Sequence, residues 1–146
     1  MRLGEQDFAP LADAFEASQK QVGFLLTAWV FLPDHWHAIL CRRPPIRISD
    51  AMQMIKQRST HAIGAARSGT SRLWQPRFHD HGLRTVREYM DAVTYIHLNP
   101  VRRGLVRRPE EWKWSSVHDY SPGGISPLPV DRANLPLDQD ASLWLP

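Results

Sequence analysis

The spacing of apolar residues in the first forty positions predicts a helix followed by a hairpin. Residues 8–20 carry apolar side chains at helical intervals. Residues 22–32 and 35–41 are rich in β-branched and aromatic residues, and a Pro-Asp pair marks a turn between them. Two such segments joined by a short turn predict an antiparallel pair of strands.

The later pattern predicts two more helices joined by an extended segment. Residues 50–67 show helical spacing behind a candidate N-cap, Ser49. Residues 73–79 are expected to be extended, and a helix then begins at Thr85, whose TVRE sequence is a capping box. We expect this helix to end near Asn99, because the following proline disfavours helical geometry in the residue before it.

The chain is expected to form one domain over residues 1–120 with a loose tail over residues 121–146, where Pro, Gly, Leu and Asp occur without period. Its 42% apolar and 23% charged residues are typical of a globular protein. No apolar run approaches the roughly 18 residues of a membrane span. The one cysteine, Cys41, fits a reducing compartment, so we expect a cytoplasmic protein.

Charge is distributed unevenly along the chain. Residues 42–108 contain 14 of the 18 basic residues and only four acidic ones, a net charge of +10, whereas the remaining residues sum to −7. Arginine-rich surfaces pair with phosphate oxygens and release counterions from nucleic acids. The middle of the chain therefore indicates a phosphate-bearing partner, with a solvated basic surface as the alternative.

Two histidines in the second predicted strand form a candidate metal site. Side chains alternate between the faces of a strand, so His35 and His37 point one way and Trp36 points the other, toward the core. Two imidazoles rarely hold a metal alone, so a third ligand is expected. A His-x-His sequence is common, and two strand histidines without a metal are the alternative.

The helix after Thr85 carries the other candidate group. An apolar stripe follows one side of this helix. The stripe comprises Val86, Tyr89, Met90, Val93 and Ile96. His97 falls within the stripe and is interpreted as a packed residue. Tyr95 lies opposite the stripe with Asn99 one turn further on, so Tyr95 is either a reactive phenol or an ordinary surface tyrosine.

The chemistry of these groups is complementary if the two elements meet. A phenol is a poor nucleophile at neutral pH, and a divalent metal can polarise a phosphate and steady the leaving oxygen. His35, His37 and the side-chain oxygen of Asn99 would make an open three-ligand site with Tyr95 beside the scissile phosphate. This mixed ligand set suits Mg²⁺ or Mn²⁺ better than a structural zinc ion.

Five blocks of sequence, in order, resemble the single-tyrosine HUH transposase family and specifically its REP-associated branch. The blocks are LPDHWH at 32–37, IK at 55–56, LWQPRF at 73–78, YIHLNPVRRGLV at 95–106 and WKWSS at 112–116. Each block is weak alone, but five in this order are specific. The resemblance covers about residues 22–120.

This resemblance implies a ferredoxin-like α+β fold, with an antiparallel sheet and helices on one face. It implies a metal-dependent endonuclease and strand transferase that cuts DNA through a 5′-phosphotyrosine intermediate. Tyr95 would be the nucleophile, His35 and His37 the metal ligands, and Asn99 the third ligand. The REP-associated branch implies palindromic DNA hairpins with an adjoining single strand as the substrate, bound by a monomer or a homodimer.

Several residues in the matched blocks are candidate DNA contacts. Five basic side chains are candidates for phosphate, and one tryptophan could stack on a splayed base. They are Lys56, Arg58, Arg77, Arg102, Arg103 and Trp74. Core packing is the stronger alternative for the tryptophan, and a solvated surface charge is the alternative for each arginine.

Two departures from the family pattern affect these expectations. The family begins with a strand before the first helix, and residues 1–10 contain no such strand, so we expect an unpaired sheet edge. The residue before the first histidine is Asp34 where the family has Asn, and both residues suit a turn. A degenerate protein that grips DNA hairpins without cutting them is therefore a second hypothesis. A metal-dependent hydrolase that forms no covalent adduct is a third.

Overall fold

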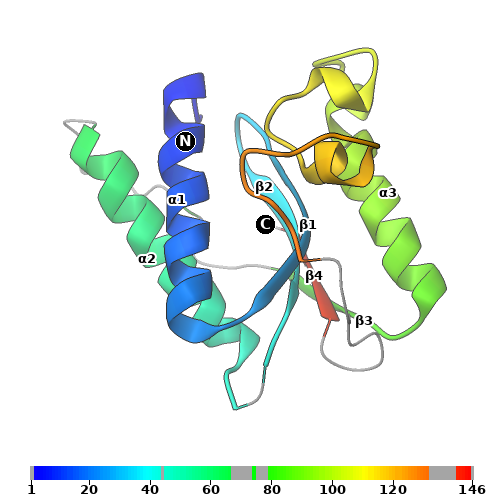
Figure 1. Ribbon diagram of the computed structural model, residues 1–146. Helices are drawn as coiled ribbons and strands as arrows, with labels where there is room; N and C mark the ends of the chain where they lie inside the picture. The colour runs from blue at the N-terminus through cyan, green and yellow to red at the C-terminus, as the bar shows by residue number, and fades with distance from the viewer. Residues whose placement is uncertain (1, 44, 67–73, 75–78, 132–140, 146) are drawn as a thin grey trace.

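We describe the fold from a computed structural model of the chain, which covers residues 2–43, 45–66, 74, 79–131 and 141–145 (Figure 1). The helices and strands follow the predicted order with one addition, a C-terminal strand. In chain order they are α1 (Glu5–Val22), β1 (Leu25–Phe31), β2 (Trp36–Cys41), α2 (Ile48–Ala66), β3 (His79–Leu83), α3 (Val86–Arg102), the 3-10 turns η1 (Pro109–Glu111) and η2 (Ser116–Tyr120), and β4 (Ala141–Leu145). Most of the extended segment predicted over residues 73–79 lies outside the described residues.

The four strands form one antiparallel sheet in the order β1-β2-β4-β3, which confirms the α+β class. β2, α2 and β3 make a split β–α–β unit, and β4 lies between its two strands. In a ferredoxin-like unit this inner position belongs to the first strand. Residues 2–4 indeed form no strand before α1, but the expected unpaired edge is absent because β4 pairs with both β2 and β3.

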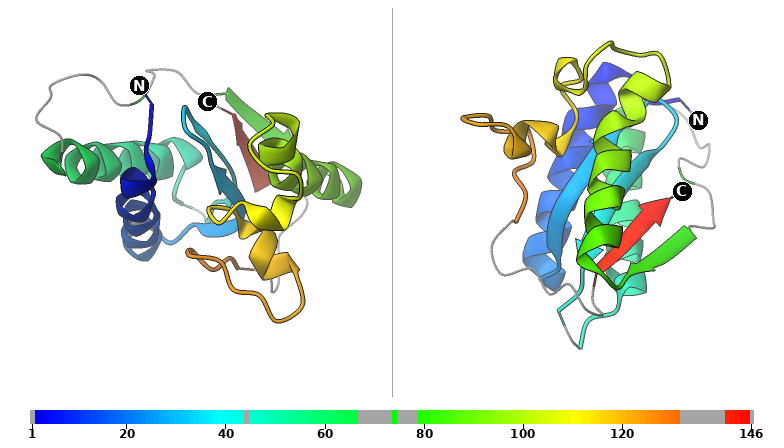
Figure 2. Two further views of the ribbon diagram at one scale, coloured as in Figure 1. Left: turned by 90° about the horizontal axis from the view of Figure 1, so that it is seen from above. Right: turned by 90° about the vertical axis from the view of Figure 1, so that its right-hand side faces the viewer.

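The helices cover both faces of the sheet, which corrects the expectation of helices on one face. Figure 2 shows α1 and α2 on one side of the strands and α3 on the other. The hairpin explains this arrangement, since both of its faces are apolar. Trp29 and Trp36 pack toward α1 and α2, whereas Val30 and Ile39 pack toward α3. A strand that is apolar on both faces must be covered on both.

The helix α3 begins as predicted but runs further. Its N-cap Thr85 accepts a hydrogen bond from the Glu88 backbone N–H at 3.0 Å. The helix was expected to end near Asn99, yet it continues through Pro100 to Arg102. A proline lacks one backbone N–H donor, and because Pro100 stands two residues before the end of α3, its disturbance is confined to the last turn. The helix ends instead before Gly104, whose φ of 72° is the left-handed conformation typical of a glycine after a helix.

The segment after α3 covers the outer edge of β1. The Phe31 N–H donates to the carbonyl of Trp114 at 2.9 Å, and the Trp29 N–H donates to Ser116 Oγ at 2.9 Å. The Tyr120 hydroxyl donates to the carbonyl of Thr27 at 2.5 Å. These bonds satisfy backbone groups that would otherwise be exposed on an edge strand.

The loose tail expected over residues 121–146 is ordered where the structure describes it. Leu128 is buried in the core, and its carbonyl accepts a hydrogen bond from Trp29 Nε1 at 2.8 Å. The Asp131 N–H donates to the carbonyl of Leu26 at 2.8 Å. These contacts and the pairing of β4 with β2 hold the described part of the tail against the domain, although its composition shows no period. In the described part of the chain, no helix combines the length and apolarity that crossing a membrane requires.

Candidate functional site

The two histidines converge at the start of β2. His35 ends the turn between β1 and β2, and His37 lies on the face of β2 that packs against α3, with 4% of its surface exposed. Their Nε2 atoms are 2.9 Å apart, and the rings are nearly perpendicular at 85°. The expectation that both imidazoles share one side is therefore confirmed.

The spacing of these nitrogens fits a shared cation. Two ligands in neighbouring octahedral positions, each about 2.1 Å from a metal, are separated by about 3.0 Å, close to the observed 2.9 Å. Within the described ranges, no group of three His, Cys, Asp or Glu side chains could hold a metal. Further ligands to such a cation would come from an amide, water or a substrate phosphate.

Tyr95 lies on α3, and its ring packs against the histidine pair of the hairpin. Its ring centroid lies 5.5 Å from that of His37, with the rings at 70°. The helix is held in place by a buried side that faces the sheet and comprises Tyr89, Ala92, Val93 and Ile96. The predicted stripe was wrong at its N-terminal end, since Val86 and Met90 are 60% and 52% exposed. Tyr89, which lies between them in the chain, is buried, so the buried side of the helix is narrower than the predicted stripe.

Asn99 and Arg102 follow Tyr95 on the same helix. Asn99 is buried with 6% exposure, and its role as the third ligand stays a prediction. The guanidinium carbon of Arg102 lies 5.4 Å from the centroid of the Tyr95 ring, a cation–π contact. A positive charge therefore lies beside the phenol ring of Tyr95.

An ion pair that sequence reasoning missed connects the hairpin turn to the end of α3. Arg103 Nη1 and Nη2 lie 2.9 Å from Asp34 Oδ1 and Oδ2, respectively, and His35 Nδ1 lies 2.7 Å from Asp34 Oδ1. Partial burial alone would raise the pKa of Asp34, but hydrogen bonds from Arg103 and His35 outweigh it and lower the pKa to about 2. The only sequence signal was an acidic residue where the family has Asn.

His97 is packed, as its place in the stripe predicted. It is 8% exposed, its Nε2 lies 2.8 Å from Ser116 Oγ, and its ring packs edge-on against Tyr120. Burial lowers the pKa of His97 to about 4; Asp119 opposes this shift and His118 adds to it. The neutral imidazole thus ties the middle of α3 to the segment that covers β1.

The candidate DNA contacts are dispersed over several elements. Lys56 lies on α2, where burial lowers its pKa, and Arg58 on the same helix donates to Gln21. Arg77 lies outside the described residues. Trp74 packs edge-on against Trp36 and donates from Nε1 to Ser59 Oγ at 2.8 Å, the core packing that we weighed against base stacking.

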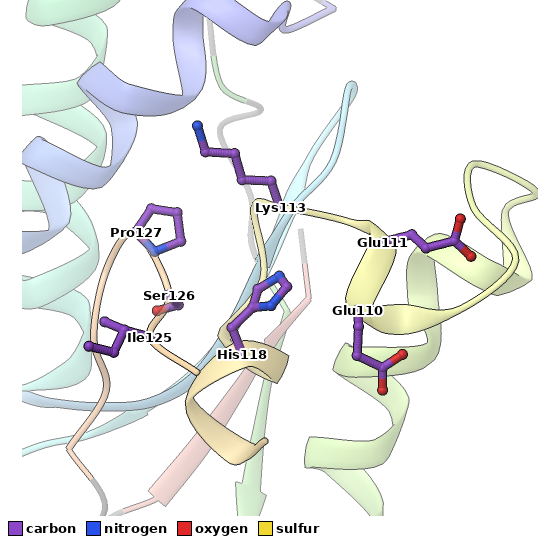
Figure 3. A pocket seen from close by; sticks show the side chains of 7 residues that line it. All are labelled: Glu110, Glu111, Lys113, His118, Ile125, Ser126 and Pro127. Carbon is purple, nitrogen blue, oxygen red and sulfur yellow. The ribbon is translucent and has the colours of Figure 1, made fainter. Parts of the chain in front are cut away.

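A separate pocket of about 440 Å³ lies among η1, η2 and the loop at residues 125–127 (Figure 3). Glu110 and Glu111 line it together with Lys113 and His118. It shares no residue with the group formed by His35, His37 and Tyr95. Two carboxylates on its wall make it a poor site for a DNA backbone.

Comparison with known proteins identifies the family. The family described as "Transposase IS200 like" matches residues 4–98. The chain belongs to this transposase family. A REP-associated tyrosine transposase of Escherichia coli K12 is 35% identical over 106 residues, which is 72% of this chain and 61% of the relative. A relative of similar description from Haemophilus influenzae is 25% identical over 115 residues, 72% of this chain and 65% of its own length.

One solved structure extends this likeness to the fold. A REP-associated tyrosine transposase bound to a REP hairpin matches with a TM-score of 0.73 and 28% identity, over 92% of this chain and 81% of the other. This transposase family therefore includes the chain at the level of both sequence and fold. The chain spans less than two thirds of the length of the two curated relatives.

Proposed function

We propose that this transposase-family chain is a metal-dependent endonuclease and strand transferase that cuts single-stranded or hairpin DNA through a 5′-phosphotyrosine on Tyr95. The observation that carries the proposal is the meeting of the Tyr95 ring with His37, 5.5 Å between centroids, beside a histidine pair whose nitrogens are 2.9 Å apart. Tyr95 and His37 are 58 positions apart in the chain, yet the fold brings the phenol and the histidine pair together, which supports this proposal.

The reaction follows from this placement. The phenol oxygen of Tyr95 attacks the phosphorus, an O–P bond forms to the tyrosine, and the bond to the 3′ oxygen breaks. The phenol loses its proton, and the departing oxygen gains one to become a free 3′-OH. Mg²⁺ or Mn²⁺, held by His35 and His37, would withdraw charge from the phosphate oxygens. Arg102, whose guanidinium carbon lies 5.4 Å from the centroid of the Tyr95 ring, would pair with the same phosphate.

The phosphotyrosine keeps the energy of the broken phosphodiester. Attack by a second 3′-OH on the phosphotyrosine would then join a new strand and release Tyr95. The His37–Tyr95 contact forms within one chain, which supports use of Tyr95 in the chain that supplies the histidines. A monomer would then contain the whole group, and a homodimer would not need to exchange helices.

Palindromic hairpin DNA is the proposed substrate. The similar solved structure holds a REP hairpin, and residues 42–108 of this chain carry a net charge of +10. We expect hairpin affinity to fall steeply with added salt, because several phosphates are neutralised on binding. Affinity that does not change with salt would remove the basic segment from the proposal.

The test is cleavage of an end-labelled DNA hairpin with a single-stranded flank, in Mg²⁺, Mn²⁺ or EDTA, resolved on a denaturing gel. The wild-type protein should give a metal-dependent covalent adduct, and Tyr95→Phe should give none. Tyr89→Phe, on the buried side of the same helix, is the matched control and should retain the adduct. Equal cleavage by Tyr95→Phe would remove this residue as the nucleophile.

Two other outcomes correspond to the competing hypotheses. Cut DNA without an adduct would indicate a metal-dependent hydrolase. Hairpin binding without cutting would indicate a degenerate binding protein. The position of β4 weakens the case for the second of these, because the inner place in the sheet is filled.

A further inference from the structure

We propose that Asp34 and Arg103 form a positioning clamp that sets the ring orientation and the proton-bearing nitrogen of His35, an inference that rests on the proposed function. The clamp assigns Arg103 a role within the protein, in place of the phosphate contact expected from the sequence. It also explains what the acidic residue before His35 does in this chain.

The clamp joins the two elements that supply the reactive groups. Asp34 lies in the turn between β1 and β2, and Arg103 is the C-cap of α3. Each carboxylate oxygen of Asp34 lies 2.9 Å from one guanidinium nitrogen of Arg103. This bidentate geometry fixes the planes of both groups. The end of α3 that follows Tyr95 is therefore held against the residue that precedes His35.

The distances identify the nitrogen of His35 that carries the proton. His35 Nδ1 is 2.7 Å from Asp34 Oδ1, an approach that needs a proton between the two atoms. Arg103 Nη1 also lies 3.1 Å from this nitrogen, but a guanidinium can only donate. The consistent arrangement is that Nδ1–H and Arg103 both donate to the carboxylate.

A proton on Nδ1 leaves the Nε2 lone pair of His35 directed at His37, where a cation would bind. Partners of this kind, which hold the far nitrogen of a ligand imidazole, fix its tautomer and orientation. The side chains of Asp34 and Arg103 are 52% and 38% exposed, and exposed ion pairs contribute little to folding stability. The expected effect of the clamp is therefore on the site rather than on stability.

The first experiment reads the proton position without a metal. Long-range ¹H–¹⁵N NMR correlations of the histidine rings in EDTA, at a pH where His35 is neutral, distinguish the two tautomers. Wild-type His35 should carry its proton on Nδ1, and Asp34→Ala should give a mixture. Asp34→Asn keeps an accepting oxygen and should restore the Nδ1 form. A wild-type Nε2 proton, or no change in Asp34→Ala, would overturn the clamp.

The second experiment measures Mn²⁺ affinity of the full chain by electron paramagnetic resonance. Asp34→Ala and Arg103→Ala should each weaken binding by about tenfold, and the double variant should lose little more, because both changes remove the same arrangement. Arg47→Ala and Asp50→Ala disrupt an exposed pair at the start of α2 and should have no effect. Full additivity of the two clamp variants would contradict the proposal.

Hairpin binding in EDTA separates the clamp from a phosphate contact. The clamp predicts that Arg103→Ala keeps the salt dependence of the wild type, whereas loss of one phosphate contact lowers the slope by about one. Failure of wild-type Mn²⁺ binding or of adduct formation would count against the proposed function. The NMR result decides the clamp in that case, because it needs neither metal nor cleavage.

Discussion

The two neighbours of β2 differ in how far away they lie in the chain. β1 precedes β2 across a short turn, whereas β4 comes from the C-terminal end and pairs Ala141 with Cys41. The nearby partner is visible in the sequence, and the distant one is not. His37 lies opposite Val30 of β1, and the pairing with β4 begins one residue later at Ala38, so the strand that carries the candidate site is held by both neighbours, although only one of them could be predicted.

The same contrast applies to the outer edge of β1 and to α3. Residues 112–131 bond to β1 and also, through Ser116, to His97 of the helix. Distant segments thus hold a hairpin and a helix that the local pattern defines. Variants that remove each distant contact, with controls that do not, test how much the fold relies on them.

Deletion of residues 141–146 should have the largest effect. It leaves β2 and β3 without the strand between them and exposes backbone groups on both. We expect a loss of about 5 kcal/mol or more in the free energy of unfolding, comparable to the whole stability of a small domain. Urea denaturation followed by circular dichroism measures it, with deletion of Pro146 alone as the control. A cooperative transition of unchanged midpoint would show that β4 is dispensable.

His97 should make stability depend on acidity. Its pKa is lowered from 6.5 to about 4 in the folded chain, so below pH 6.5 the unfolded chain takes up a proton that the folded chain refuses. The stabilisation is complete above pH 6.5 and is lost as the pH falls toward 4, by about 3 kcal/mol.

Urea titrations in EDTA across this range, compared between wild type and His97→Gln, isolate the contribution of His97 from that of the carboxylates. The variant should lose stability less steeply over the same interval. His61→Gln removes an exposed histidine of α2 and should retain the wild-type slope. Equal slopes for wild type and His97→Gln would argue against a buried neutral imidazole.

Asp131→Ala should lower the free energy of unfolding by about 1–2 kcal/mol. The carboxylate of Asp131 accepts hydrogen bonds from Gln19 Nε2 at 2.6 Å and from the Leu26 N–H at 3.1 Å, and the variant loses both. Amide exchange at Leu26 should accelerate in the same variant. Asp13→Ala, an exposed carboxylate of α1, is the control for loss of charge. Unchanged exchange at Leu26 would mean that the carboxylate does not anchor the segment to β1.

The sequence predicted the local elements and brought out the residues of the candidate site. The alternation around Trp36 placed His35 and His37 together, and the helical spacing placed Tyr95 away from the stripe. The structure adds that the two groups meet. The reaction itself was assigned from the resemblance to a known family and not from the spacing of residues.

The contacts between distant segments were not predictable from local spacing. A short strand such as β4 in a Pro- and Asp-rich region gives no periodic signal, because its burial depends on neighbours far along the chain. The Asp34–Arg103 pair was missed for the same reason. A charged residue is typical of a protein surface, and the sequence alone does not indicate which distant residue pairs with it. Pro100 led to a predicted helix end near Asn99, because a proline disfavours helical geometry in the residue before it. In the structure α3 continues through Pro100 to Arg102.

The smallest effect is expected at Met90, where the periodicity placed a core residue and the structure has a side chain that is 52% exposed. Met90→Gln should change the free energy of unfolding by no more than about 0.5 kcal/mol, because little apolar surface becomes newly exposed. Val93→Ala, one turn along and 4% exposed, should cost about 2 kcal/mol. Equal costs at the two positions would mean that α3 is buried along its whole length, and that the local stripe describes the helix better than its contacts with the hairpin.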